Sequence, residues 1–179
     1  MRVIYYVIII IGIFTAESGY AQRYMSDSTY VRFFSEAPLE NIDAVTYESA
    51  SAIDLSSGNV AFSVPIKSFQ FDKSLMQEHF NENYLESDKY PKATFQGKMK
   101  DWDDEEGEKR ITASGKMKIH GITQEISVEG TVIHSGDEIV IRAVFPVRLE
   151  DYEIDIPKAV FYNIAEVVEV TIFFSYKPL

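Results

Sequence analysis

The sequence contains no cysteine. That absence excludes disulfide bonds, a thiol nucleophile, thiolate metal ligands and a lipid-modified N-terminal cysteine. Basic residues are also scarce, because 17 Lys and Arg stand against 28 Asp and Glu and give a formal net charge of −11. Nucleic acids and anionic membrane surfaces favour basic proteins, so we expect neither as the main partner. The acidity is typical of a well-solvated protein surface.

Recognisable catalytic motifs are missing as well. The chain has no Gly-x-Ser-x-Gly elbow and no glycine-rich phosphate loop. The three histidines, His79, His120 and His134, do not form the short pairs that are typical of zinc sites. Glu78 and His79 are one candidate acid–base pair, but no second group completes a catalytic set around them. We therefore predict no metal, no cofactor and no enzyme activity.

Only one long apolar run is present, and it lies at the N-terminus. Val3 to Phe14 are 12 apolar residues, fewer than the roughly 20 that a membrane-spanning helix needs. Arg2 precedes the run, and Gly19-Tyr20-Ala21 places small residues before a cleavage site. We predict a signal peptide over residues 1–21, with an uncleaved anchor as the alternative. Residues 22–179 then form one domain that is periplasmic or secreted and has no stable membrane span.

The rest of the chain has the residue pattern of β-strands. Apolar and polar residues alternate from Val60 to Lys67 and, over the clearest stretch, from Ile111 to Ile119. Pro65 lacks a backbone donor, which predicts an edge strand or a bulge there. Further alternating runs follow His120-Gly121 and the turn at Ser135–Asp137.

One short helix is expected in the middle of the chain. Ser74 to Asn83 has helical spacing, with Leu75, Met76, His79 and Phe80 on one face. Ser74 and Gln77 together have the spacing of a capping box. About eight strands and one helix predict an all-β fold, a lipocalin-like eight-stranded antiparallel β-barrel with one short mid-chain α-helix.

The chain is rich in aromatic residues, with 12 Phe, 11 Tyr and one Trp. A barrel interior lined by Phe, Met, Ile and Val suits an apolar ligand, although the sequence leaves open whether that interior is hollow or packed shut. Strand alternation and the helix face give the candidate ligand-binding residues. They are Phe62, Val64, Ile66, Leu75, His79, Phe80, Phe95, Met99, Met117, Ile119, Ile126, Val128, Ile139, Ile141 and Phe145.

Two stretches resemble a known family. They are "SFQFDKSLMQEHFNENYLESDKYPKATFQGKM" and "GKMKIHGITQEISVEG", and in their order they look like the YceI-like family of polyisoprenoid-binding periplasmic proteins. The matching positions are Glu78-His79, Tyr84-Leu85, Lys89-Tyr90-Pro91, Thr94-Phe95, Gly115, Met117, Ile119 and Gly121-Ile122-Thr123. The resemblance covers about residues 26–176 and implies an extended lipocalin-like barrel that holds an isoprenoid chain without catalysis.

The chain also departs from the family pattern near the helix. Met76-Gln77 stands where Arg-Asp is usual, and Phe69-Gln70-Phe71 follows Ser68 in place of Ile-x-Thr. Near the C-terminus, Glu153 stands where a glycine is common. These bulkier residues bear on the ligand rather than on the fold.

Taken together, the sequence predicts a carrier that buries a polyisoprenoid or quinone-like lipid inside the barrel. An apolar lipid-like molecule is then the expected partner, and a homodimer is left open. Two alternatives remain. One is a structural or interaction module with a packed barrel core, and the other is an enzyme that uses His79 and Glu78.

Overall fold

The computed structural model describes residues 23–36, 41–100, 102–103, 105–156 and 165–179. The predicted signal peptide, residues 1–21, lies outside them. Ten strands make up most of the described chain. They are β1 (Arg23–Ser35), β2 (Ile42–Thr46), β3 (Ala50–Asp54), β4 (Asn59–Pro65), β5 (Gln70–Phe71), β6 (Lys92–Lys100), β7 (Gly107–Ile119), β8 (Ile122–Ser135), β9 (Glu138–Arg148) and β10 (Val167–Pro178).

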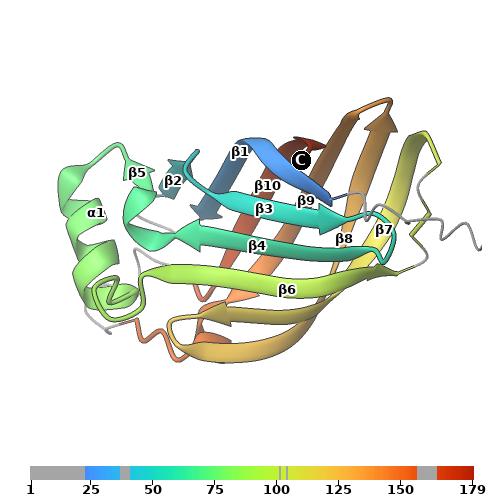
Figure 1. The fold of residues 1–179 in the computed structure, drawn as a ribbon. Coiled ribbons are helices and arrows are strands. Elements are labelled where there is room, and N and C mark those ends of the chain that lie inside the picture. The colour runs from blue at the N-terminus through green and yellow to red at the C-terminus, as the bar shows by residue number, and fades with distance from the viewer. Residues whose placement is uncertain (1–22, 37–40, 101, 104, 157–164) are drawn as a thin grey trace, which may run out of the picture.

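The sheet closes on itself through β1. This strand pairs along its length with β10, and its other edge pairs with β3 at Arg23–Met25 and with β2 at Val31–Ser35. The ring therefore runs β1-β3-β4-β6-β7-β8-β9-β10 and back to β1, and all its pairs are antiparallel. The predicted eight-stranded barrel is confirmed (Figure 1). The short strands β2 and β5 extend its wall beside the helix.

The helix lies at one end of the barrel (Figure 1). The helix α1 spans Ser74–His79 and continues as one π-helical segment, η2 (Phe80–Tyr84), which the N–H of Leu85 closes by donating to the Phe80 carbonyl at 2.9 Å. The predicted capping box is wrong. Lys73 precedes the first turn, and no side chain caps it.

Two short 3₁₀ segments complete the fold, η1 (Ile66–Ser68) after β4 and η3 (Leu149–Tyr152) after β9. The prediction for Pro65 is also corrected here. The strand β4 lies inside the sheet between β3 and β6, and Pro65 is its last residue. The pairing of β3 with β4 ends at Ser63. Pro65, which has no backbone N–H, therefore lies past the end of that pairing and removes no hydrogen bond from it.

The barrel interior differs between its two ends. Toward the end away from α1, inward side chains such as Ile139, Phe174 and Tyr176 are fully buried. Ser51 Oγ donates its one proton to the Ala61 carbonyl at 2.8 Å. It can therefore only accept from the Tyr176 hydroxyl, which lies 2.7 Å away. This buried pair links β10 to β3 across the interior. The far end is therefore packed solid, and any space for a ligand lies nearer the helix.

Candidate ligand-binding site

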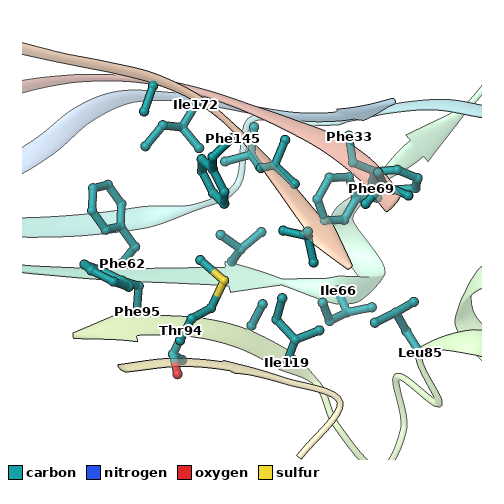
Figure 2. Close-up of a pocket in the computed structure, with 18 of the residues that line it drawn as sticks. Phe33, Phe62, Ile66, Phe69, Leu85, Thr94, Phe95, Ile119, Phe145 and Ile172 are labelled. Atoms are coloured by element: carbon teal, nitrogen blue, oxygen red, sulfur yellow. The ribbon is translucent and has the colours of Figure 1, made fainter. Parts of the chain in front are cut away.

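A cavity of about 440 Å³ lies inside the barrel between its walls and α1 (Figure 2). Its volume falls within the range of roughly 300–1,000 Å³ that is usual for small-molecule sites. It is also about three times the volume of an engineered apolar cavity of about 150 Å³ that holds benzene. The cavity is therefore large enough for a substantial apolar ligand.

The cavity lining is almost wholly apolar. Among the described residues that line it, none is Asp, Glu, Lys or Arg, and the polar side chains are Ser35, His79, Tyr84 and Thr94. Burial raises the pKa of the Tyr84 phenol above its ordinary value, so this group is uncharged at neutral pH. The lining offers hydrophobic contact along its length and hydrogen bonds at only a few points.

The exposure of inward-facing residues shows that this half of the barrel is hollow. Met117, Val128 and Ile172 point into the barrel, yet each is only half-buried because it faces the cavity instead of a neighbouring side chain. Ile139 also points inward but has no exposed surface, since it lies in the solid half. Strand alternation places all four side chains on the inner face.

Three phenylalanines form the floor of the cavity. Phe62 lies 5.0 Å from Phe174, edge to face, and 6.2 Å from Phe95, measured between ring centroids. All three rings line the cavity. Phe174 in turn stacks on Tyr176, with centroids 6.3 Å apart. The cavity therefore ends where the solid half of the barrel begins.

A second aromatic group closes in at the helix end. Phe80 stacks on Phe33 at 5.1 Å and also contacts Phe69 at 5.7 Å and Phe71 at 5.0 Å. Phe80 is the first residue of the π-helical segment η2. The π-helical turn is rare and often occurs at functional sites. The two phenylalanines that depart from the family pattern, Phe69 and Phe71, thus lie together against the helix.

Helix α1 itself forms part of the cavity rim. Leu75 and His79 both line the cavity, although Leu75 is 60% exposed and His79 is also exposed. No hydrogen bond or ion pair holds the His79 imidazole among the residues that the structure describes. The cavity therefore meets solvent beside the helix, with one imidazole at its edge.

Most of the predicted ligand-binding residues lie together around this cavity. Thirteen of the fifteen line it, namely Phe62, Val64, Ile66, Leu75, His79, Phe80, Phe95, Met99, Met117, Ile119, Val128, Ile141 and Phe145. The other two, Ile126 and Ile139, do not. Ile139 belongs to the solid half, and Ile126 is half-buried and packs against the core. Alternation identifies the inner face of a strand, but it does not give the depth of a residue along the barrel.

Sequence reasoning missed the contributions of β1 and β10. Val31 and Phe33 from β1, and Val170 and Ile172 from β10, line the cavity. In β10, Glu169 and Thr171 alternate with Val168, Val170 and Ile172, so the same rule of alternation could have identified the inner face of this strand. The exposed face of β1 also carries aromatic rings, so its inner face is not apparent from the sequence.

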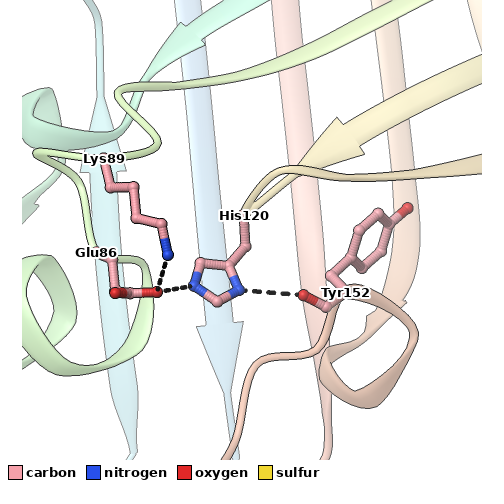
Figure 3. A network of polar contacts seen from close by, with 4 residues as sticks. All are labelled: Glu86, Lys89, His120 and Tyr152. Atoms are coloured by element: carbon pink, nitrogen blue, oxygen red, sulfur yellow. Dashed lines mark hydrogen bonds and ion pairs between the residues drawn. The ribbon is translucent and has the colours of Figure 1, made fainter.

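A polar network fastens the barrel end that faces the helix (Figure 3). His120 Nε2 lies 2.8 Å from Glu86 Oε2, and its Nδ1 lies 3.2 Å from the Tyr152 carbonyl oxygen. Lys89 Nζ is 3.8 Å from the same Glu86 oxygen, and the Tyr90 ring packs edge-on against the imidazole. His120 thus joins the β7–β8 turn to the segment after η2 and to η3.

The residues whose positions the structure describes contain no group of three His, Asp or Glu side chains arranged to hold a metal ion. None of their helices has the length and apolar character that crossing a bilayer requires.

Comparison with known proteins yields a family match and several similar structures. The sequence model of the YceI-like domain matches residues 27–176. A polyisoprenoid-binding domain from Saccharophagus degradans, implicated in plant cell wall breakdown, superposes with a TM-score of 0.75 at 15% identity, over 87% of this chain and 98% of that one. BcnA from Burkholderia cenocepacia superposes with a TM-score of 0.70 at 16% identity, over 82% and 95%.

A third similar structure is the YceI protein of Campylobacter jejuni, with a TM-score of 0.63 at 15% identity over 80% of this chain and 88% of that one. No functionally curated protein matches the sequence. At these identities the likeness establishes a shared fold.

Proposed function

Because this chain belongs to the family of YceI-like domains, we propose that it is a binding protein that holds a polyisoprenoid or a similar long apolar lipid inside its barrel. It carries or sequesters that lipid without chemical change. The observation that carries this proposal is the hollow half of the barrel, which is lined almost wholly by apolar side chains. The name of the similar Saccharophagus degradans domain supports the same class of ligand.

Burial of the ligand's hydrocarbon supplies the affinity. Each buried CH₂ group contributes about 0.8 kcal/mol, so ten buried carbons give roughly 8 kcal/mol before association costs of several kcal/mol are subtracted. A long prenyl chain exceeds that cost, whereas a small polar metabolite does not. The hollow interior also argues against a module whose barrel core is packed shut.

We propose an orientation for the ligand within the cavity. The apolar tail points toward the floor at Phe62, Phe95 and Phe174, because that end is closed and wholly apolar. The polar head lies at the helix end, where Tyr84 and the exposed His79 border the cavity. His79 then acts as a hydrogen-bonding group for an alcohol, phosphate or quinone head.

The proposal extends to the place of action. Residues 1–21 have the charge and apolar pattern of a signal peptide. We propose that the chain is exported and works in the periplasm or outside the cell, where an apolar lipid needs a carrier to cross water.

Two neighbouring residues of β10 provide the test. Ile172 lines the cavity, whereas Thr171 points outward from the same strand. Ile172→Glu places a carboxylate inside the cavity and should abolish binding of farnesol or geranylgeraniol, measured by displacement of the fluorescent fatty acid cis-parinaric acid. Thr171→Glu is the matched control and should bind as the natural protein does.

Circular dichroism and thermal unfolding establish that both variants are folded. Equal binding by folded Ile172→Glu and Thr171→Glu would show that the ligand does not occupy the cavity. An absence of binding by the unmodified protein would exclude the carrier function itself.

A further inference from the structure

The barrel wall is incomplete between β8 and β9. These strands pair only from Gly130 opposite Ala143 to Ser135 opposite Glu138, near the hairpin that joins them. Beyond the pair of Gly130 and Ala143, on the side away from the hairpin, residues 122–129 of β8 pair only with β7, and residues 144–148 of β9 pair only with β10. We call this interval, between residues 122–129 and residues 144–148, the seam.

One end of the seam is set by small residues. Gly130 and Ala143 are the last pair before the strands separate. A Cβ atom added at Gly130 would lie 2.7 Å from the Arg142 carbonyl oxygen and 3.1 Å from the Ala143 Cβ. The two strands therefore approach each other closely at this pair, and any larger residue at position 130 would force them apart.

The other end of the seam is bridged by η3. Gln124 Nε2 donates to the Asp151 carbonyl at 2.6 Å, and His120 Nδ1 contacts the Tyr152 carbonyl oxygen at 3.2 Å (Figure 3). Tyr152 is itself buried, so η3 is held firmly. The seam is thus a window with a strand on each side, a tight pair at one end and a fixed turn at the other.

The cavity reaches both sides of this window. Val128 on β8 and Phe145 and Val147 on β9 all line the cavity. Val128 and Phe145 point inward, yet they remain half-buried. The cavity wall at the seam is therefore made of side chains alone, without the backbone ladder that closes the rest of the barrel.

Backbone chemistry keeps the seam accessible to water. Every second residue of an antiparallel strand directs its N–H and C=O toward each neighbour. Among the described residues, no backbone hydrogen bond joins residues 122–129 to residues 144–148. Unpaired backbone groups are costly when they are buried, so those at the seam must be hydrated. On the outside, Val144 is 58% exposed and Pro146 is also exposed, which gives the window an apolar rim.

We propose that the seam is a side entrance through which an apolar chain passes into the cavity. This proposal rests on the proposed function, because it concerns how the same cavity is filled. An apolar chain slides past Val144 and Pro146, between Val128 and Phe145, and reaches the cavity without displacing Phe80 or the three phenylalanines around it. The alternative route is the cavity rim at Leu75 and His79.

A covalent bridge across the seam tests this route, and the absence of natural cysteine makes the chemistry selective. In the double variant Ser127→Cys and Pro146→Cys, both new thiols lie on the outer face, where continuation of the strand register would place them opposite each other. A bis-maleimide with a short flexible spacer then joins them. The matched control is Ser135→Cys with Glu138→Cys, which the same reagent bridges where the strands already pair.

Stopped-flow mixing with cis-parinaric acid measures the rates. We expect the bridge at the seam to slow association and dissociation by about tenfold each, since a blocked passage hinders both directions, and to leave Kd nearly unchanged. The control bridge should change neither rate. A change in Kd at constant association rate would instead mean that residues 127 and 146 act only on the bound state, and it would overturn the proposal.

A second pair of single variants keeps the result independent of bridge formation. Val144→Cys and Leu75→Cys each take a bulky maleimide adduct, the first at the seam and the second beside α1. Slower association with the adduct at position 144 alone supports the side entrance. Slower association with the adduct at position 75 alone assigns the route to the helix end and refutes the side entrance. A failure of the unmodified protein to bind the probe contradicts the proposed function, not the route.

Discussion

Phe174→Ala perturbs the cavity floor, and its consequences follow from the packing of that ring. Phe174 has no exposed surface, meets Phe62 edge to face at 5.0 Å and stacks on Tyr176. Truncation of a buried phenylalanine typically lowers the free energy of unfolding by about 3–5 kcal/mol. Domains of this size are stable by about 5–15 kcal/mol, so the variant should remain folded with a clearly lower Tm.

The same substitution deepens the cavity by the space of one phenyl ring. That space suits about one further isoprene unit, or five carbons, whose burial gives at most about 4 kcal/mol. We therefore expect the preference between geranylgeraniol and farnesol to move toward the longer chain. Added geranylgeraniol should also restore part of the lost Tm, because a ligand that binds only the folded state stabilises it.

Competition against cis-parinaric acid with prenols of increasing length measures the preference. Phe173→Ala is the matched control, since Phe173 is the adjacent residue of β10, points outward and lies beneath the Arg142 guanidinium at 5.1 Å. An unchanged chain-length preference in Phe174→Ala, or an equal change in Phe173→Ala, would contradict this expectation.

Two further predictions concern the helix end and the solid end. Phe80→Ala removes the ring that stacks on Phe33 and should lower the free energy of unfolding by about 2–4 kcal/mol, somewhat less than for a fully buried ring. The probe should also leave faster, because these rings lie at the helix end of the cavity. Chemical denaturation measures the first effect, and stopped-flow release measures the second. Burial raises the pKa of Tyr176, so the folded state keeps a proton that the unfolded chain loses above about pH 10. The free energy of unfolding should therefore fall as the pH rises through that value, by at most about 1.4 kcal/mol per pH unit. Tyr176→Phe should reduce this dependence on alkaline pH, and it should cost about 1 kcal/mol of unfolding free energy at neutral pH through the lost hydrogen bond to Ser51. An unchanged slope in denaturation experiments between pH 9 and pH 11 would show that Tyr176 is not the group responsible.

Strand alternation identifies the inner face of a strand where polar residues separate the apolar ones. In β7, Ile111, Ala113 and Met117 alternate with polar residues, and all three line the cavity as a strand of period two requires. In β1, by contrast, Tyr30 and Phe34 face outward and Phe33 faces inward, so aromatic side chains occupy both faces and the pattern does not identify the inner one.

Other features depend on tertiary geometry that no local pattern records. Ile139 and Ile141 share a strand face, yet only Ile141 borders the cavity, because the floor lies between the two depths. The seam depends on where two strands diverge, and the sequence marks that point only by Gly130. The π-helical turn likewise begins at Phe80, whose ring packs against three other rings that lie outside the helix.

The proposed carrier function requires that the hollow half of the barrel holds an apolar chain. Organic extraction and mass spectrometry of the full-length protein, purified without detergent from the cells that make it naturally, test this claim most directly. We expect one apolar long-chain lipid per protein molecule, present in the natural protein and depleted in Ile172→Glu. Repeated absence of bound lipid, together with no rise in Tm when farnesol, geranylgeraniol or a prenyl quinone is added, would contradict it.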